Sequence, residues 1–124
     1  MKFISDLLIL IVAFEALFIM VLEMFFTQTK LARNAFDLSK EYLQQKEAKV
    51  SMANQGLYNG FFGIGIIISR FILPFDARNM ALYLFIGFVI IAALYGAVTA
   101  NKKIILSQGL PAIIALIALL VVNL

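Results

Sequence analysis

The sequence contains no cysteine, no histidine and no tryptophan. Without cysteine the chain forms no disulfide and no thiolate metal site, and without histidine it lacks the usual base of a nucleophilic triad. Charge is also scarce, since only 14% of the 124 residues are charged. These absences disfavour an enzyme, although carboxylates alone can act as general acid and base. They also give no reason to expect a metal or a cofactor.

What the chain has in excess is hydrophobic side chains, at 64% of its residues. A soluble domain of this size could not bury them all. Each of four apolar runs is close to the ~20 residues that cross a bilayer as a helix. We therefore predict an all-α integral membrane protein, a four-helix antiparallel bundle forming a single transmembrane domain over 1–124. The expected helices are 3–26, 56–75, 80–100 and 104–122.

The first run is expected to remain as a helix rather than to be cleaved as a signal peptide. It is too long for a signal peptide, carries Asp6, Glu15 and Glu23, and has no small-residue cleavage site. Between the first two runs lies a polar interfacial segment, 27–53, in which Leu31, Ala35, Leu38 and Tyr42 recur at helical spacing. This pattern predicts an amphipathic helix on the membrane surface or across the mouth of the bundle; a solvated charged helix is the alternative.

The distribution of basic residues predicts the topology. Helices joined by loops as short as 101–103 are antiparallel neighbours, so the first and third loops share one face. That face carries most of the basic residues: Lys30, Arg33, Lys40, Lys46, Lys49, Lys102 and Lys103. By the positive-inside rule it is cytoplasmic, which places both termini outside the plasma membrane. Arg70 is expected to reach the outer interface or to pair with Asp76.

Two glutamates inside the first apolar run are the most informative residues for function. An ionised carboxylate near the bilayer centre costs at least about 2.5 to 3.5 kcal/mol, so it is retained only with a reason. Glu15 lies midway along the predicted helix, and Glu23 lies about 12 Å nearer the cytoplasm. We interpret them as a proton or substrate site whose protonation state the sequence leaves open.

Polar residues on the other helices fall near the level of Glu23. Together they predict a cluster in the cytoplasmic half of the bundle: Asn54, Gln55, Tyr58, Asn59, Tyr95, Ser107 and Gln108. Their amides could hydrogen-bond a carboxyl group in either protonation state. The alternative is that they only hold helices together, at about 0.6 kcal/mol per bond.

Small residues and one proline predict how the helices pack. Gly56, Gly60 and Gly96 have the spacing that lets helix backbones approach closely. Pro111 removes a backbone hydrogen bond, which predicts a bend beside Gln108. The stretches NQGLYNG (54–60) and SQGLPAI (107–113) resemble each other, and we interpret this as two similar helix starts rather than as an internal repeat.

Four stretches also carry a resemblance to a known family: FEALFIMVLEMFF (14–26), NQGLYNGFFGIGI (54–66), IAALYGAVT (91–99) and SQGLPAIIALI (107–117). They are similar to the bacterial membrane family known as domain of unknown function 1304, over essentially the whole chain. The resemblance implies four helices and supplies no activity. Members often have a histidine after the first glutamate, where this chain has Ala16, which argues against an essential histidine.

Small multidrug-resistance transporters offer a mechanistic analogy, because they have four helices and an essential glutamate in the first. Glu15 would fit that role, but the motifs NQGLYNG and SQGLP are not theirs and tryptophan is missing. The first hypothesis is therefore a proton-coupled carrier or exporter of a small solute, working as a homodimer. The alternative is a non-catalytic binding or scaffold protein that holds a lipid or a partner protein. Both involve the lipid bilayer, and neither involves nucleic acid.

Overall fold

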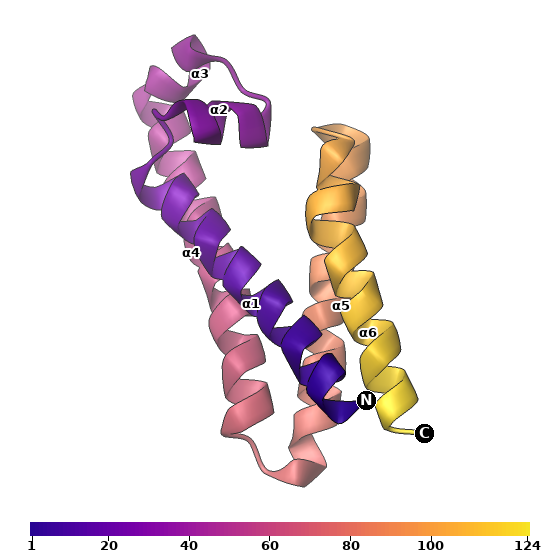
Figure 1. Cartoon of the computed structure of the whole chain (residues 1–124). Coiled ribbons are helices and arrows are strands. Elements are labelled where there is room, and N and C mark those ends of the chain that lie inside the picture. The colour runs from indigo at the N-terminus through magenta and orange to yellow at the C-terminus, as the bar shows by residue number, and fades with distance from the viewer.

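The computed structural model describes all 124 residues, and it contains helices but no strands. The long helices are α1 (Lys2–Phe25), α4 (Lys46–Phe71), α5 (Phe75–Thr99) and α6 (Leu110–Val122), the last preceded by a π-helical segment, η1 (Ile105–Gly109). Two short helices, α2 (Lys30–Phe36) and α3 (Lys40–Gln44), lie at one end (Figure 1). The predicted all-α class is confirmed.

Three helical segments are long and apolar enough to cross a membrane: α1, α5 and the continuous segment from η1 through α6. The helix α4, which contains the second predicted span, is not among them. Its apolar stretch is interrupted by Asn54, Gln55, Asn59 and Arg70, and its first eight residues belong to the polar segment. Composition therefore supports three spans, one fewer than the four that we predicted.

The long helices are arranged as two pairs. Helix α1 crosses α4 in the most extensive helix–helix contact of the protein, while α5 packs against η1 and α6. The pairs meet through α1 against α6 and α4 against α5. The two termini and the α4–α5 turn lie at one end, and α2 and α3 lie at the other (Figure 1).

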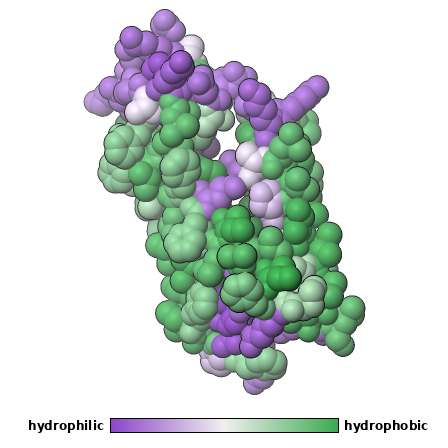
Figure 2. Space-filling model, in the orientation of Figure 1, coloured by the Kyte–Doolittle hydropathy of each residue, from purple (hydrophilic) through white to green (hydrophobic).

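The hydrophobic core lies in the half of the molecule nearer the termini. Its residues come from the start of α1, the end of α4, the start of α5 and the whole of α6: Ile9, Val12, Ala13, Ile66, Leu82, Ile86, Ala112, Ala115 and Leu119. In contrast, large apolar side chains cover much of the outer surface, where they form a hydrophobic belt between two hydrophilic ends (Figure 2). An exposed belt of this kind is typical of membrane association.

Glycines set the close approach of α4 to α1. A β-carbon on Gly63 would lie 2.8 Å from the backbone oxygen of Ala13, and one on Gly56 would lie 2.9 Å from Cβ of Glu23. A side chain at Gly60 would collide with Met20. Gly96, in contrast, faces only the side chain of Ile104. The small residues therefore lie where two backbones nearly touch.

The polar segment differs from the single amphipathic helix that we predicted. Thr29 and Ser39 each accept a hydrogen bond from a backbone N–H as N-caps, so each starts a new helix. Asp37 adopts a left-handed conformation (φ 54°) and ends α2. The chain then continues directly into α4 at Lys46, rather than starting a helix at Gly56. The prediction of one helix was wrong because it used only the helical spacing of Leu31, Ala35, Leu38 and Tyr42. It did not take these local stop signals into account.

The irregularity predicted at Pro111 is present as the π-helical turn η1. Pro111 occupies the first turn of α6 and cannot donate a backbone hydrogen bond. The N–H of Leu110 instead bonds to the carbonyl of Ile105, five residues back. Ser107 and Gln108 lie within this widened turn.

Arg70 pairs with Asp6 of α1, not with Asp76 as we considered from the sequence. Its Nε and Nη2 each donate to one carboxylate oxygen of Asp6 at 2.6 Å. Both side chains are largely shielded, at 14% and 27% exposed. Asp76, in the first turn of α5, is exposed. A pairing across 64 residues has no signal in local sequence, whereas Asp76 is merely close along the chain.

The tight α1–α4 contact predicts that Gly63→Ala destabilises the fold by about 1 to 3 kcal/mol, because the new methyl group meets the Ala13 backbone. Gly87→Ala is the matched control, since nothing lies within 4 Å of its added β-carbon. Thermal unfolding in detergent should therefore show a lower midpoint for the first variant only. Equal midpoints would contradict the close approach.

The bidentate pair predicts that Asp6→Asn lowers the free energy of unfolding by about 1 to 3 kcal/mol, because a shielded guanidinium loses its charged acceptor. The exposed carboxylate of Asp76 provides the control, and Asp76→Asn should have little effect. Unfolding in detergent at low and high salt measures both. A larger loss of unfolding free energy for Asp76→Asn than for Asp6→Asn would contradict the pairing of Arg70 with Asp6.

Candidate functional site

Three adjoining cavities lie between the α1–α4 pair and the α5–η1 pair, in the half of the molecule nearer α2. Their volumes are about 360, 40 and 420 Å³, and Ile19 and Gln108 line all three. We call them together the polar hollow. Figure 2 shows the molecule hollowed between the two helix pairs, with hydrophilic side chains in the opening. The predicted site residues that line it are Glu15, Glu23, Gln55, Asn59, Tyr95, Ser107 and Gln108.

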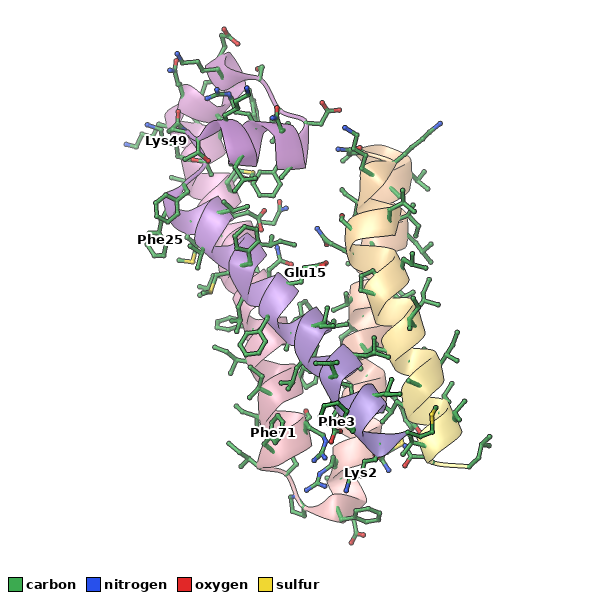
Figure 3. All side chains as sticks on the ribbon, in the orientation of Figure 1. Lys2, Phe3, Glu15, Phe25, Lys49 and Phe71 are labelled. Carbon is green, nitrogen blue, oxygen red and sulfur yellow. The ribbon has the colours of Figure 1, made fainter.

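Glu15 is the carboxyl group with free access to the polar hollow. It lines the first two cavities, is half-buried, and forms no hydrogen bond or ion pair within the protein. Figure 3 shows its side chain extending from α1 toward the space beside α6. Both of its oxygens are thus available to a bound molecule.

Glu23, two turns further along α1, has a different environment. It is 1% exposed, and its Oε1 accepts a hydrogen bond of 2.5 Å from Nδ2 of Asn59 on α4. Its second oxygen, Oε2, has no partner although it is buried. Gly56 makes this contact possible, because a larger residue there would collide with the base of the Glu23 side chain. Glu23 therefore links two helices, lines the third cavity and still has one buried, unsatisfied oxygen.

The opposite wall of the polar hollow is formed by η1 and α5. The widened turn of η1 places Ser107 beside the first cavity and Gln108 beside all three. From α5, Tyr95 and Gly96 line the third cavity. The absence of a side chain at Gly96 leaves room between α5 and Ile104.

Two residues of the predicted cluster lie elsewhere. Asn54 donates to the carbonyl of Val50 in its own helix and is exposed. Tyr58 is 65% exposed and packs edge-to-face against Phe61. Depth along the helix placed both at the right level, but their positions around α4 point them away from the polar hollow.

Of the two placements predicted for the polar segment, the structure supports the one across the mouth of the bundle, because α2 contributes to the site. Asn34, Ala35 and Phe36 of α2 line the first cavity, and Ala35 and Phe36 also line the third. Lys103 lines the first cavity from the other side. We had used Lys103 only to predict topology, and we had placed Ala35 on an apolar stripe. The helical spacing of the segment predicted a helix at the mouth of the bundle, but not which of its side chains line the cavities.

Chemically, the polar hollow combines two carboxyl groups with amides, hydroxyls and one ammonium group. Carboxyl and amide oxygens accept hydrogen bonds, so the arrangement suits a solute that donates them or carries a positive charge. No three Asp, Glu, His or Cys side chains come close enough to form a metal site. The site therefore has the groups for binding and for proton exchange.

Comparisons with known proteins identify relatives but no activity. The family described as "Protein of unknown function (DUF1304)" matches residues 10–120. The "Uncharacterized protein YpaA" of Lactococcus lactis subsp. lactis (strain IL1403) is 41% identical over 118 residues, which cover 95% of this chain and 98% of that protein. No solved structure matches the chain significantly. The residues that line the polar hollow fall within the family match, and the chain belongs to the DUF1304 family.

Proposed function

We propose that this protein is a multi-pass membrane carrier that exchanges protons for a small solute in the polar hollow. The observation that carries the proposal is the placement of Glu15, unpaired and half-buried, in a hollow that continues to Glu23. A carboxyl group inside an apolar helix that has no structural partner is a functional group by default. A closed, fully packed bundle would have favoured a scaffold instead.

The membrane arrangement proposed here has α1, α4, α5 and the η1–α6 segment all crossing the bilayer. Helix α4 lacks the composition of an independent span, but it packs along α1, where Asn59 pairs with Glu23 and Arg70 pairs with Asp6. The end with α2 and α3 carries most of the basic residues and would face the cytoplasm. The two termini, which share the other end, would then lie outside (Figure 1).

In this mechanism Glu15 binds either a proton or the solute. The solute donates hydrogen bonds or brings a positive charge, and displaces the proton from the carboxyl group. Gln108 lines all three cavities and so offers its amide along the whole path between Glu15 and Glu23. Ala35 and Phe36 of α2 cover the cytoplasmic side of the path. A chain this small is expected to work as a homodimer.

The predicted effect of Glu15→Gln is loss of proton coupling, because the amide keeps the shape of the side chain but cannot release a proton. Purified protein in vesicles containing a pH-sensitive dye is exposed to a panel of small amines and lipophilic cations. A solute that moves protons through the wild-type protein should move none through the variant. Glu47→Gln, which changes an exposed carboxylate in the first turn of α4, is the control and should retain full coupling. Normal coupling in Glu15→Gln would refute the carrier.

A scaffold function is the second candidate, and the bond between Glu23 and Asn59 favours it. This bond joins α1 to α4 in a buried position, as expected of a contact that specifies how helices fit together. A lipid or a partner protein would then be held on a rigid bundle, with no solute flux.

The buried bond predicts that Asn59→Ala lowers the free energy of unfolding by about 1 to 3 kcal/mol, because Glu23 loses its only partner. Asn54→Ala, in the same helix, removes only an exposed bond to Val50 and should melt like the wild type. Thermal unfolding in detergent compares the two. If the Asn59 variant is as stable as the Asn54 variant, Glu23 has no structural role and the scaffold loses its support.

A further inference from the structure

A fourth cavity, of about 260 Å³, lies at the opposite end of the molecule from α2. It is formed where the first turn of α1 and the last turn of α6 meet the end of α4 and the start of α5. The Asp6–Arg70 pair forms part of its wall. Nothing in the carrier or scaffold proposals uses this cavity.

The cavity has an excess of positive charge. Four charged residues besides the termini line it, and three of them are basic: Lys2, Arg70 and Arg78, with Asp6 as the single acid. Asp6 is already engaged by two nitrogens of Arg70 in the one salt bridge of the protein. Lys2 and Arg78 therefore have no carboxylate partner. An anion in the cavity would meet two uncompensated cations.

Hydrogen-bond donors at the cavity also lack acceptors. Ser5 is 2% exposed, and its hydroxyl group has no partner. The Nε of Arg78 is likewise buried and unpartnered, while its Nη2 makes only a long bond of 3.3 Å to the carbonyl of Leu73. Buried polar groups in folded proteins are nearly always satisfied, and an unpaired one costs free energy. A ligand with several acceptor oxygens would satisfy both residues at once.

Phosphate is the chemical group that fits these donors best. Its oxygens accept from hydroxyl, ammonium and guanidinium groups together, and arginine binds them in a charge-assisted geometry. Asn79 and Asn123 extend the polar wall on the other side of the cavity. They hydrogen-bond each other at 3.2 Å and so form a fixed edge rather than competing for the anion.

The surroundings of the cavity indicate that the phosphate belongs to a lipid. Large apolar side chains around it are strongly exposed, including Phe3, Ile72 and Phe75 at more than 70%. Figure 3 shows Lys2 together with Phe3 and Phe71 at this end of the molecule. A cationic polar pocket beside exposed apolar residues is what a headgroup and its acyl chains require.

We propose that this cavity binds the phosphate group of a phospholipid, with Lys2, Ser5 and Arg78 as the contacting residues. The Asp6–Arg70 pair joins α1 to α4 and forms part of the cavity wall, but it does not itself bind the phosphate. The site is separate from the polar hollow, so it does not depend on whether the protein carries a solute.

The test measures binding of short-chain phosphatidylglycerol to the purified full-length protein in a non-ionic detergent. Arg78→Gln is expected to weaken the affinity about tenfold, as for loss of one charge-assisted hydrogen bond. Ser5→Ala should weaken it less, and Lys2→Gln, at the exposed start of α1, gives a variant that cannot disturb the core. Arg33→Gln, at the opposite end, is the matched control and should bind like the wild type.

Two further ligands separate the possible sources of the phosphate. Inorganic phosphate alone should bind much more weakly than the lipid, and a short-chain diacylglycerol without phosphate should not be sensitive to Arg78→Gln. Equal loss of affinity in the Arg78 and Arg33 variants would overturn the site, because it would show attraction to net charge only. Unchanged affinity in both the Arg78 and Lys2 variants would also overturn it. Equal affinity for inorganic phosphate would overturn the lipid as the source.

Discussion

The near-contact of two helix backbones is the constraint on which the rest of the structure depends. Because Gly56 and Gly63 have no side chains, α4 lies directly against α1, and Asn59 reaches the buried carboxyl group of Glu23. At the other end of the same pair, this closeness brings Arg70 to Asp6. Polar residues that would be costly on an isolated helix are thus matched between two helices. The α1–α4 pair can therefore enclose carboxyl and guanidinium groups without exposing them to an apolar surround.

The space between the two helix pairs divides along its length into an apolar core and a polar hollow. The core residues occupy the half nearer the termini, and the polar hollow occupies the half nearer α2. The division follows from the sequence of α6 and η1. Helix α6 contributes alanines that allow close packing, whereas the π turn before it widens the helix and carries Gln108. A single helical segment therefore closes one half of the protein and lines the hollow in the other.

Features that depend on residues close together in the sequence were predictable, and features that depend on distant residues were not. Long apolar runs predicted α1, α5 and α6 well, because helix formation and membrane-like composition are properties of contiguous residues. Depth along α1 and α4 also placed Glu23 and Asn59 at one level. The partner of Arg70, the side chains of α2 that line the hollow and the outward direction of Tyr58 were not predictable in the same way. Each depends on how helices rotate and pack against one another, and one sequence carries no signal for that.

The polar segment shows the same limit at short range. Its apolar residues do recur at helical spacing. However, Thr29 and Ser39 cap new helices with local hydrogen bonds, and Asp37 forms a left-handed turn, so the segment is not one continuous helix. Whether helical periodicity or local capping prevails in such a segment depends on the tertiary path of the chain. Here α4 packs back along α1, and the chain between these two helices turns twice within a short length.

The position of the apolar core has a mechanical consequence. The two helix pairs are packed together by the core near the termini and are separated by the hollow at the other end, so any tilt between the pairs would pivot about the core. A helix of 20 residues is about 30 Å long, so a tilt of only about 10° at the pivot moves its far end by about 5 Å. A small rearrangement among the alanines near the termini would therefore produce a large change in the width of the opening beside α2. The small apolar side chains of α6 are therefore the part of the protein where a change in packing would affect such movement most.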